Sequence, residues 1–381
     1  MSGHTPAAHE GSVDILGLTL GEFIALAAER GMRTPRATAC YRAAFRDGRA
    51  VEPWITIARP PIVRTERDAG AWGETVKFVQ RHDDGLETES VLIPMRHRNA
   101  PTTRTICVSS QVGCAMGCVF CETAQMGLLK NLTAAQIVAQ WFAARHERPA
   151  DRETIQPALA LKNMVFMGMG EPMDNLSAVI QAIRVLCERD GPGMASSNIA
   201  VSTVGRVEGI RRFGEFIRER GFHRCNLAVS LNAPNDEIRS SIMPINRKHP
   251  MAALREAMLD FPLRPSSAIC VEYVLIPGVN DALEHCDELC DYLRPVRCSL
   301  NVIPYNPRRN SPWPAPSEES VDRFMRRAVE RGQFVKRRQT KGRGVMGACG
   351  QLGNEEIRHR KRVERPLGLT IDGRAPEPDH S

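Results

Sequence analysis

The stretch CVSSQVGCAMGCVFC, residues 107–121, follows a short apolar run and places Cys114, Cys118 and Cys121 in a C-x3-C-x2-C arrangement. Three thiolates this close along the chain can converge on one small site, and the two glycines of the stretch let the backbone wrap tightly around it. Three cysteines that ligate a [4Fe–4S] cluster leave its fourth iron open for another molecule. The stretch therefore predicts an iron–sulfur site in a loop after a strand.

A zinc site is the first alternative for these three cysteines, because structural zinc sites also use thiolates. Such sites usually have four ligands, and neither a second C-x2-C pair nor paired histidines stand near residues 114–121. Buried thiols without any ligand are the second alternative. The spacing favours the iron–sulfur cluster.

From residue 105 onward, short apolar runs alternate with amphipathic helical patterns, as in proteins built from repeated βα units. The predicted strands span residues 106–109, 164–167, 199–203, 227–231, 270–276, 300–303 and 334–338. The predicted helices span about residues 133–146, 175–188, 207–220, 251–260, 282–293 and 318–331. This rhythm predicts the α/β class and a partial or full parallel barrel, whose reactive loops lie at the C-terminal ends of the strands.

The chain divides into three predicted parts. Residues 1–95 form a small N-terminal accessory domain with two helical patterns and a strand hairpin that turns at residues 83–85. Residues 96–352 form the barrel, including the segment that carries Cys349. Residues 353–381 are polar and basic, and this composition predicts a disordered tail.

The composition is that of a protein that does not enter a membrane: 42% of the residues are hydrophobic, 25% are charged, and no apolar stretch approaches the roughly 18 residues of a membrane span. The first residues do not resemble a signal peptide, so a cytoplasmic location is expected. Twelve cysteines in such a chain favour metal or catalytic roles over a disulfide framework. The net charge of +7 favours a polyanionic partner.

The C-x3-C-x2-C stretch, with an aromatic residue before its last cysteine, resembles the radical S-adenosylmethionine (SAM) superfamily, and residues 107–131 resemble its RlmN/Cfr branch of RNA adenine methyltransferases. Five more motifs follow in the family's order: GMGEP at 168–172, VSTVG at 201–205, SLNAPND at 230–236, IPYNP at 303–307 and ACGQL at 348–352. The resemblance covers about residues 89–352. It implies a partial (β/α)6 TIM-like barrel, one [4Fe–4S] cluster, and two SAM molecules per turnover.

The resemblance also implies which residues contact SAM. In GMGEP, Gly170 and Glu171 are the expected contacts to the amino group, and a carboxylate suits an ammonium ion. The other expected SAM contacts are Ser202, Ser230, Leu231, Asn232 and Asn306. Familiar family members have histidine at the position of Asn232, and asparagine keeps a donor and an acceptor but does not titrate near neutral pH. From the residues alone, each polar group could equally be a satisfied group at a strand terminus.

Two further cysteines distinguish this branch. The resemblance implies that Cys349 is methylated by one SAM, and that a radical made from a second SAM then removes a hydrogen from this methyl group. The carbon adds to an adenine, and Cys107 attacks the Cys349 sulfur, which releases the product and leaves a disulfide that must be reduced. From the residues alone, Cys107 could be a fourth cluster ligand or a buried strand thiol, and Cys349 a buried thiol. The resemblance makes Glu89 the proton acceptor; a solvated strand carboxylate is the alternative.

The resemblance implies that the substrate is an adenine of ribosomal RNA, transfer RNA or both, with carbon 2 favoured over carbon 8. The expected partners are this RNA and a reductant such as flavodoxin or ferredoxin, and a monomer is expected. Basic residues gather in 206–224, 323–343 and 358–365, where they could hold phosphates or form ordinary solvated helix faces. Two alternative functions stay open: another radical SAM reaction on RNA or protein, and RNA binding without catalysis.

Overall fold

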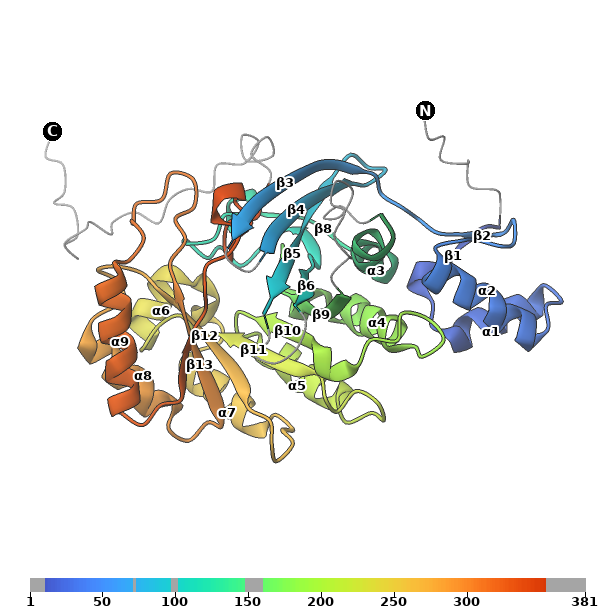
Figure 1. The fold of residues 1–381 in the computed structure, drawn as a ribbon. Coiled ribbons are helices and arrows are strands. Elements are labelled where there is room, and N and C mark those ends of the chain that lie inside the picture. The colour runs from blue at the N-terminus through green and yellow to red at the C-terminus, as the bar shows by residue number, and fades with distance from the viewer. Residues whose placement is uncertain (1–10, 71–72, 97–101, 148–159, 354–381) are drawn as a thin grey trace, which may run out of the picture.

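A ten-stranded sheet forms the centre of the computed structural model, which describes residues 11–70, 73–96, 102–147 and 160–353 (Figure 1). Its strands, in their order across the sheet, are β14 (Val335–Arg337), β13 (Cys298–Pro304), β12 (Ile269–Leu275), β11 (Asn226–Ser230), β10 (Ile199–Thr203), β9 (Ala160–Phe166), β6 (Thr103–Cys107), β5 (Glu87–Met95), β4 (Gly73–Arg81) and β3 (Ile62–Gly70). Strands β6 and β9–β14 are parallel, whereas β3, β4 and β5 extend the sheet with antiparallel pairing.

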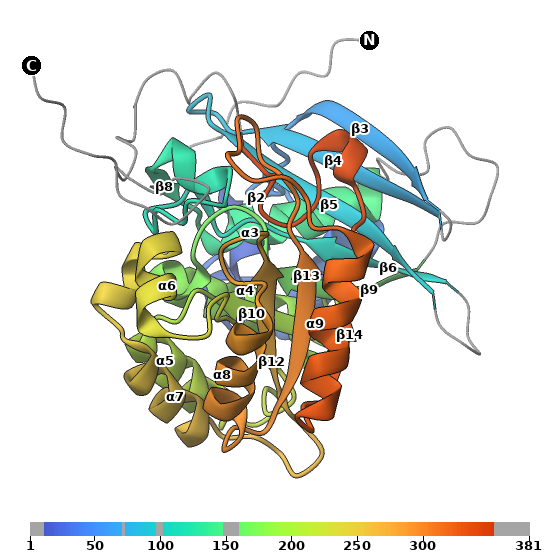
Figure 2. The same cartoon turned by 90° about the vertical axis from the view of Figure 1, so that its left-hand side faces the viewer.

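Helices fill the connections between the parallel strands. They are α3 (Ala134–Phe142), α4 (Leu176–Cys187), α5 (Val207–Phe216), α6 (Asp236–Ile242), α7 (Met251–Asp260), α8 (Leu283–Leu293) and α9 (Glu318–Glu330). Each parallel strand is added beside the preceding one, so right-handed crossovers place the helices on one face of the curved sheet (Figures 1 and 2). In α9 the buried residues Val321, Phe324 and Ala328 follow helical spacing, and Phe324 stacks on Tyr273 of β12.

The predicted α/β class and the alternation of strands and helices are confirmed, although element ends shift by a few residues. The predicted helix over 133–146 ends as α-helix at Phe142 and continues as a π-helical turn over Ala143–Glu147. Its predicted capping box is present, because Thr133 and Gln136 exchange hydrogen bonds with each other's backbone N–H groups. The short helix α6 was not predicted.

The N-terminal part packs two helices, α1 (Leu20–Glu29) and α2 (Thr34–Asp47), beside a small pair of strands, β1 (Val13–Asp14) and β2 (Ile55–Thr56). Aromatic rings of Phe23, Tyr41 and Trp54 form their core. The side chain of Arg42 pairs with Asp190, just beyond α4, at 2.7 Å. This contact ties the two helices to the barrel.

The predicted hairpin is present as β4 and β5, but it belongs to the main sheet. Strand β5 pairs with β6 from Val91 opposite Cys107 to Met95 opposite Thr103. The predicted boundary between residues 95 and 96 therefore falls between two paired strands. Of the predicted tail over 353–381, residues 354–381 lie outside the described part of the chain.

A two-stranded ribbon, β7 (Gln111–Gly113) and β8 (Leu128–Asn131), frames the loop with the three cysteines. Gly113 has φ +75°, and a Cβ there would lie 1.8 Å from the carbonyl oxygen of Gly127, so only glycine fits. From α3, the fully buried Gln140 accepts hydrogen bonds from Ser109 N and Ser90 Oγ, both at 2.8 Å, and donates to Ser109 O. One helix thus fixes the backbone that leads into the loop.

The end of the described chain crosses the open side of the sheet. We call residues 338–353 the closing segment. It begins at β14, and Lys341 Nζ donates to Pro94 O on β5 at 2.6 Å, while Gly344 N donates to Asp68 of β3. Further on, Gly350 O accepts from Glu122 N at 2.7 Å. The segment thus links the two edge strands of the sheet, β14 and β3, and reaches the cysteine loop.

No helix within the described ranges is long and apolar enough to cross a bilayer.

We predict that Gln140→Leu lowers the free energy of unfolding by about 1–3 kcal/mol, because it leaves the buried N–H of Ser109 without its acceptor. Urea denaturation of the ligand-free protein measures this loss. Glu256→Gln, on the exposed face of α7, is the control and should unfold as the wild type does. Equal stability of the Gln140 variant and the control would contradict this role of Gln140.

Candidate active site

A hollow of about 140 Å³ opens at the C-terminal ends of β9–β13. We call it the cofactor hollow. Cys114, Cys118 and Cys121 all line it, together with most of the polar residues that the sequence analysis singled out: Gly170, Glu171, Ser202, Ser230, Asn232, Asn306 and Cys349. The structure therefore brings the cysteine loop and these strand ends to one place, as parallel strands with aligned carboxyl ends require.

The three loop cysteines sit in an apolar setting with Met116, Phe120, Ile242, Met243 and Tyr305 packed around them. Burial raises the pKa of each thiol, so all three prefer the neutral form until a positive ion compensates their charge. No three ligating side chains within the described ranges converge on a single metal ion. A [4Fe–4S] core spreads its irons apart, so cysteines bound to different irons need only border the same hollow. The donor set fits such a cluster.

Glu171 is buried at the rim of the β9 strand end. Its carboxylate accepts hydrogen bonds from Met173 N at 3.0 Å and Val204 N at 2.9 Å. Burial nevertheless raises the pKa of Glu171 to about 7. Before it, Gly170 has φ +101°, and a Cβ there would lie 2.6 Å from Gln111, so the motif brings bare backbone to the hollow.

Ser202 and Ser230 border the hollow, but their hydroxyls also have a partner inside the protein. Both donate to the same carboxylate oxygen of Glu272, at 3.1 and 3.3 Å. Glu272 lies on β12, opposite Ser230 of β11, and also lines the hollow. The sequence analysis missed it, although a glutamate inside the apolar run 270–276 was a usable signal, because charged side chains are seldom buried without a role.

Asn232 and Leu231 contribute mainly through structure. Asn232 has φ +59°, a left-handed conformation that asparagine tolerates better than most residues. Its Oδ1 accepts from Val274 N at 2.9 Å, so the amide fixes β11 to β12. Leu231 is fully buried and does not line the hollow, which leaves only its backbone for any contact.

Asn306 differs from these residues because its Oδ1 is buried and has no hydrogen-bond partner within the described ranges. A buried amide oxygen without a partner is costly, so it indicates that a donor from another molecule belongs there. Asn306 also lines the second, larger cavity. This unsatisfied oxygen is the clearest sign that the hollow accommodates a polar ligand.

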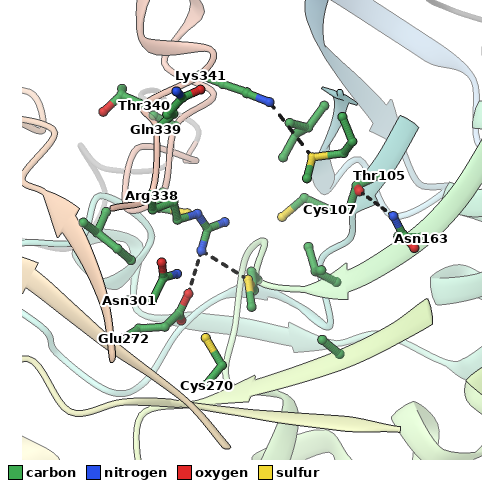
Figure 3. Close-up of a pocket in the computed structure, with 18 of the residues that line it drawn as sticks. Thr105, Cys107, Asn163, Cys270, Glu272, Asn301, Arg338, Gln339, Thr340 and Lys341 are labelled. Carbon is green, nitrogen blue, oxygen red and sulfur yellow. Dashed lines mark hydrogen bonds and ion pairs between the residues drawn. The ribbon is translucent and has the colours of Figure 1, made fainter. Parts of the chain in front are cut away.

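The second cavity measures about 630 Å³ and occupies the inside of the curved sheet (Figure 3). We call it the thiol cavity because both Cys107 and Cys349 line it. Amide and hydroxyl groups are also exposed there, on Thr105, Asn163, Asn301, Gln339 and Thr340. Of the two thiols, only Cys349 borders the cofactor hollow as well.

An ion pair lies where the two spaces meet, because Glu272 lines both of them. Arg338 Nη1, at the start of the closing segment, contacts Glu272 Oε1 at 2.6 Å and Met167 Sδ at 3.5 Å (Figure 3). The guanidinium is close enough to Cys349 and Cys107 to favour both thiolates, although burial outweighs this effect and raises the pKa of Cys107 to about 12. The sequence analysis placed Arg338 only among the basic residues of 323–343.

Glu89 lies apart from the other candidates. It is buried on β5, lines neither the cofactor hollow nor the thiol cavity, and its Oε2 accepts from Gly353 N at 3.2 Å. Burial raises its pKa, while Lys77 lowers it. The carboxylate thus sits under the end of the closing segment.

We predict that Glu171 makes the stability of the ligand-free protein depend on pH. The pKa of Glu171 is about 7 in the folded protein and 4.5 for a glutamate in the unfolded chain. The folded protein therefore holds this proton more tightly than the unfolded chain does. The resulting stabilisation is complete below pH 4.5 and is lost as the pH rises through 7. Relative to Glu171→Gln, the wild type should lose about 3 kcal/mol of unfolding free energy between pH 4.5 and 8.

Urea denaturation of both proteins across this range measures the difference. Parallel pH profiles for the wild type and Glu171→Gln would show that the Glu171 carboxyl titrates in the folded protein as it does in the unfolded chain.

Comparisons with known proteins agree with this geometry. The model of the radical SAM superfamily matches residues 108–293. A probable dual-specificity RNA methyltransferase RlmN 1 of Protochlamydia amoebophila is 41% identical over 77% of both chains, and a dual-specificity RNA methyltransferase RlmN of Anaeromyxobacter sp. is 38% identical over 92% of this chain and 93% of its own. The crystal structure of a radical SAM methyltransferase from Sphaerobacter thermophilus, 36% identical, covers 89% of this chain and 98% of its own with a TM-score of 0.78. The chain belongs to the RlmN family of radical SAM methyltransferases.

Proposed function

We propose that the protein is a radical SAM RNA methyltransferase that carries a SAM-derived carbon on Cys349 to an adenine. The observation that carries this proposal is the position of Cys349, which borders both the cofactor hollow and the thiol cavity. A sulfur in that position can receive a group on one side and deliver it on the other. The names of the relatives, dual-specificity RNA methyltransferases, support an RNA substrate.

Membership in the radical SAM superfamily implies a [4Fe–4S] cluster and SAM. When bound, the cluster would supply the electron for cleavage of SAM, and SAM would supply the methyl group and the radical. We assign Cys114, Cys118 and Cys121 to the cluster, because they border one hollow in an apolar setting. The proposed carrier role of Cys349 would use two SAM molecules per turnover, one as the source of the methyl group and one as the source of the radical.

We assign the strand-end residues to SAM. Gly170 and Glu171 would meet its amino group, and Asn306, with its unsatisfied oxygen, would meet a donor of the same molecule. Ser202 and Ser230 can keep their bonds to Glu272 and still accept a hydrogen bond each, since a hydroxyl offers two lone pairs. Leu231 and Asn232 would contribute by the shape of the β11 strand end.

The thiol cavity is our proposed site for the adenine. Its volume of about 630 Å³ falls within the range of ligand pockets, and the amides of Asn163 and Asn301 offer donors and acceptors to the edge of a base. A base can enter only when it is unstacked, so a loop nucleotide of ribosomal or transfer RNA is the expected target. We keep carbon 2 as the favoured position over carbon 8.

Cys107 lines this cavity together with Cys349 and would form the disulfide that releases the product. Its high pKa keeps it protonated at neutral pH, and the guanidinium of Arg338 would stabilise the thiolate when it forms. Glu89, which has a raised pKa, is the proposed proton acceptor for the adenine carbon. For this role the closing segment would need to shift, so that Glu89 is released from its hydrogen bond with Gly353 N. A flavodoxin or ferredoxin would provide electrons to a monomeric enzyme.

Only some of the basic residues in 323–343 are candidates for binding phosphate. Arg327, Arg337 and Arg338 already pair with Asp287, Glu318 and Glu272. Arg323 and Arg326 on α9 are exposed and are the better candidates. The N-terminal helices would add to the RNA-contacting surface.

We predict that Cys349→Ala lowers the rate of RNA methylation at least about 100-fold. 5′-Deoxyadenosine should still form from SAM, because the residues proposed to bind the cluster are unchanged. Cys270→Ala is the matched control, since its thiol lines the same cavity but has no assigned role, and it should methylate at the wild-type rate. The assay is anaerobic incubation with ribosomal and transfer RNA, followed by mass spectrometry of the digested nucleosides.

Full methylation by Cys349→Ala would refute the carrier role and favour another radical SAM reaction. A wild-type protein that produces no 5′-deoxyadenosine under reducing conditions would instead favour an RNA-binding relative without catalysis. The same digest distinguishes 2-methyladenosine from 8-methyladenosine.

A further inference from the structure

One buried positive charge has no anionic partner among the residues that the structure describes. The side chain of Arg239, on α6, is fully buried. Its hydrogen bonds go to Leu231 O at 3.0 Å, Asn246 Oδ1 at 2.9 Å, Val204 O at 2.5 Å and Ser230 O at 3.4 Å. All four acceptors are neutral, and within the described ranges no carboxylate forms an ion pair with this guanidinium.

The carboxylate of Asp236 is linked to Arg239 only through Asn246. Asn246, which accepts from Arg239, donates to Asp236 Oδ1 at 2.8 Å, but Asp236 is solvent-exposed and also accepts from Met251 N. Burial therefore lowers the pKa of the Arg239 guanidinium, against the raising effects of Tyr292, Cys118 and Asp236. A buried cation held only by neutral groups is costly, and proteins rarely keep one unless an anion belongs beside it.

The anion can be located from the neighbours of Arg239. Helix α6 packs against the cysteine loop, where Val119 N donates to Ile242 O at 3.1 Å. Cys118 and Ile242 of α6 lie in one apolar cluster, and Val204 packs against this cluster. The carbonyls that Arg239 holds belong to residues at the ends of β10 and β11, of which Val204 and Ser230 line the cofactor hollow.

We propose that Arg239 is the buried counter-charge of the iron–sulfur cluster and that it raises the reduction potential of the cluster while holding the two strand ends in place. This inference rests on the proposed function, since it needs a cluster bound by Cys114, Cys118 and Cys121. Three thiolates outweigh the positive charge of the core, so the loaded site is anionic, and reduction adds one further negative charge. A fixed cation therefore stabilises the reduced cluster more than the oxidised one. Arg239 is a positioning residue, because it touches the strand ends and not the reacting atoms.

The test compares three variants of the full chain after anaerobic reconstitution with iron and sulfide. Arg239→Gln removes the charge and keeps donors for the carbonyls, and Arg239→Lys keeps the charge with fewer donors. Arg247→Gln, on the exposed end of the 3-10 turn Pro244–Arg247, removes a neighbouring surface charge as the control. Iron content is measured first, and then the reduced fraction of the cluster by electron paramagnetic resonance at a series of fixed potentials.

We expect Arg239→Gln to lower the ratio of reduced to oxidised cluster at a fixed potential about tenfold, which equals a shift of about 59 mV for a one-electron couple. Arg239→Lys and Arg247→Gln should stay within about twofold of the wild type. A folded Arg239→Gln chain that binds no iron, with Arg239→Lys normal, would also support the counter-charge.

Three results would overturn the inference: a wild-type potential in Arg239→Gln, equal shifts in the glutamine and lysine variants, or unfolding of both, which would make the residue a clamp only. A wild-type protein that takes up no iron would refute the proposed function itself, and is recognised before any variant is compared.

Discussion

The ion pair between Arg338 and Glu272 connects the two halves of the site. Glu272 uses one carboxylate oxygen for the serines at the ends of β10 and β11, and the other for the guanidinium that begins the closing segment. The ion pair holds the start of the closing segment, which leaves β14 at Arg338 and turns inward to bring Cys349 near the cysteine loop. Breaking one partner of a buried pair strands the other charge, so cofactor hollow and thiol cavity are energetically coupled.

Burial sets the protonation state of most reactive groups at this site. The three loop cysteines, Cys107 and Glu171 all have raised pKa values because the protein around them excludes water. Two guanidinium groups oppose this effect: Arg338 lies close to Cys107 and Cys349, and Arg239 holds two strand ends that border the cofactor hollow. Without a cofactor, such buried acids favour their neutral forms, and the thiols would ionise if a positively charged cluster core were bound.

The sequence predicted the parts of this arrangement that depend on local pattern. The rhythm of apolar runs and helices predicted the parallel strands, and the spacing of Cys114, Cys118 and Cys121 predicted one shared loop. The structure places these cysteines and the motifs at 168–172, 201–205 and 303–307 on one hollow, as strands with a common direction must.

The interactions that the sequence did not predict are long-range. The pairing of β5 with β6 depends on tertiary contact, and the hairpin pattern alone cannot show that it joins the barrel. Arg338 and Glu272 lie 66 residues apart in sequence, and Arg239 meets carbonyls from two different strand ends, so neither has a local signature. A charged residue inside an apolar run was the available signal for Glu272, and it indicates burial without naming the partner.

The most direct test of the account is to follow the methyl group of deuterated SAM during an anaerobic reaction with RNA. If Cys349 carries the carbon, mass spectrometry should find a fully deuterated methyl group on the peptide that contains Cys349. The new methyl group on the adenine should then carry two deuterium atoms and one hydrogen atom. A fully deuterated methyl group on adenine, with no label on Cys349, would mean direct transfer from SAM and would contradict the account.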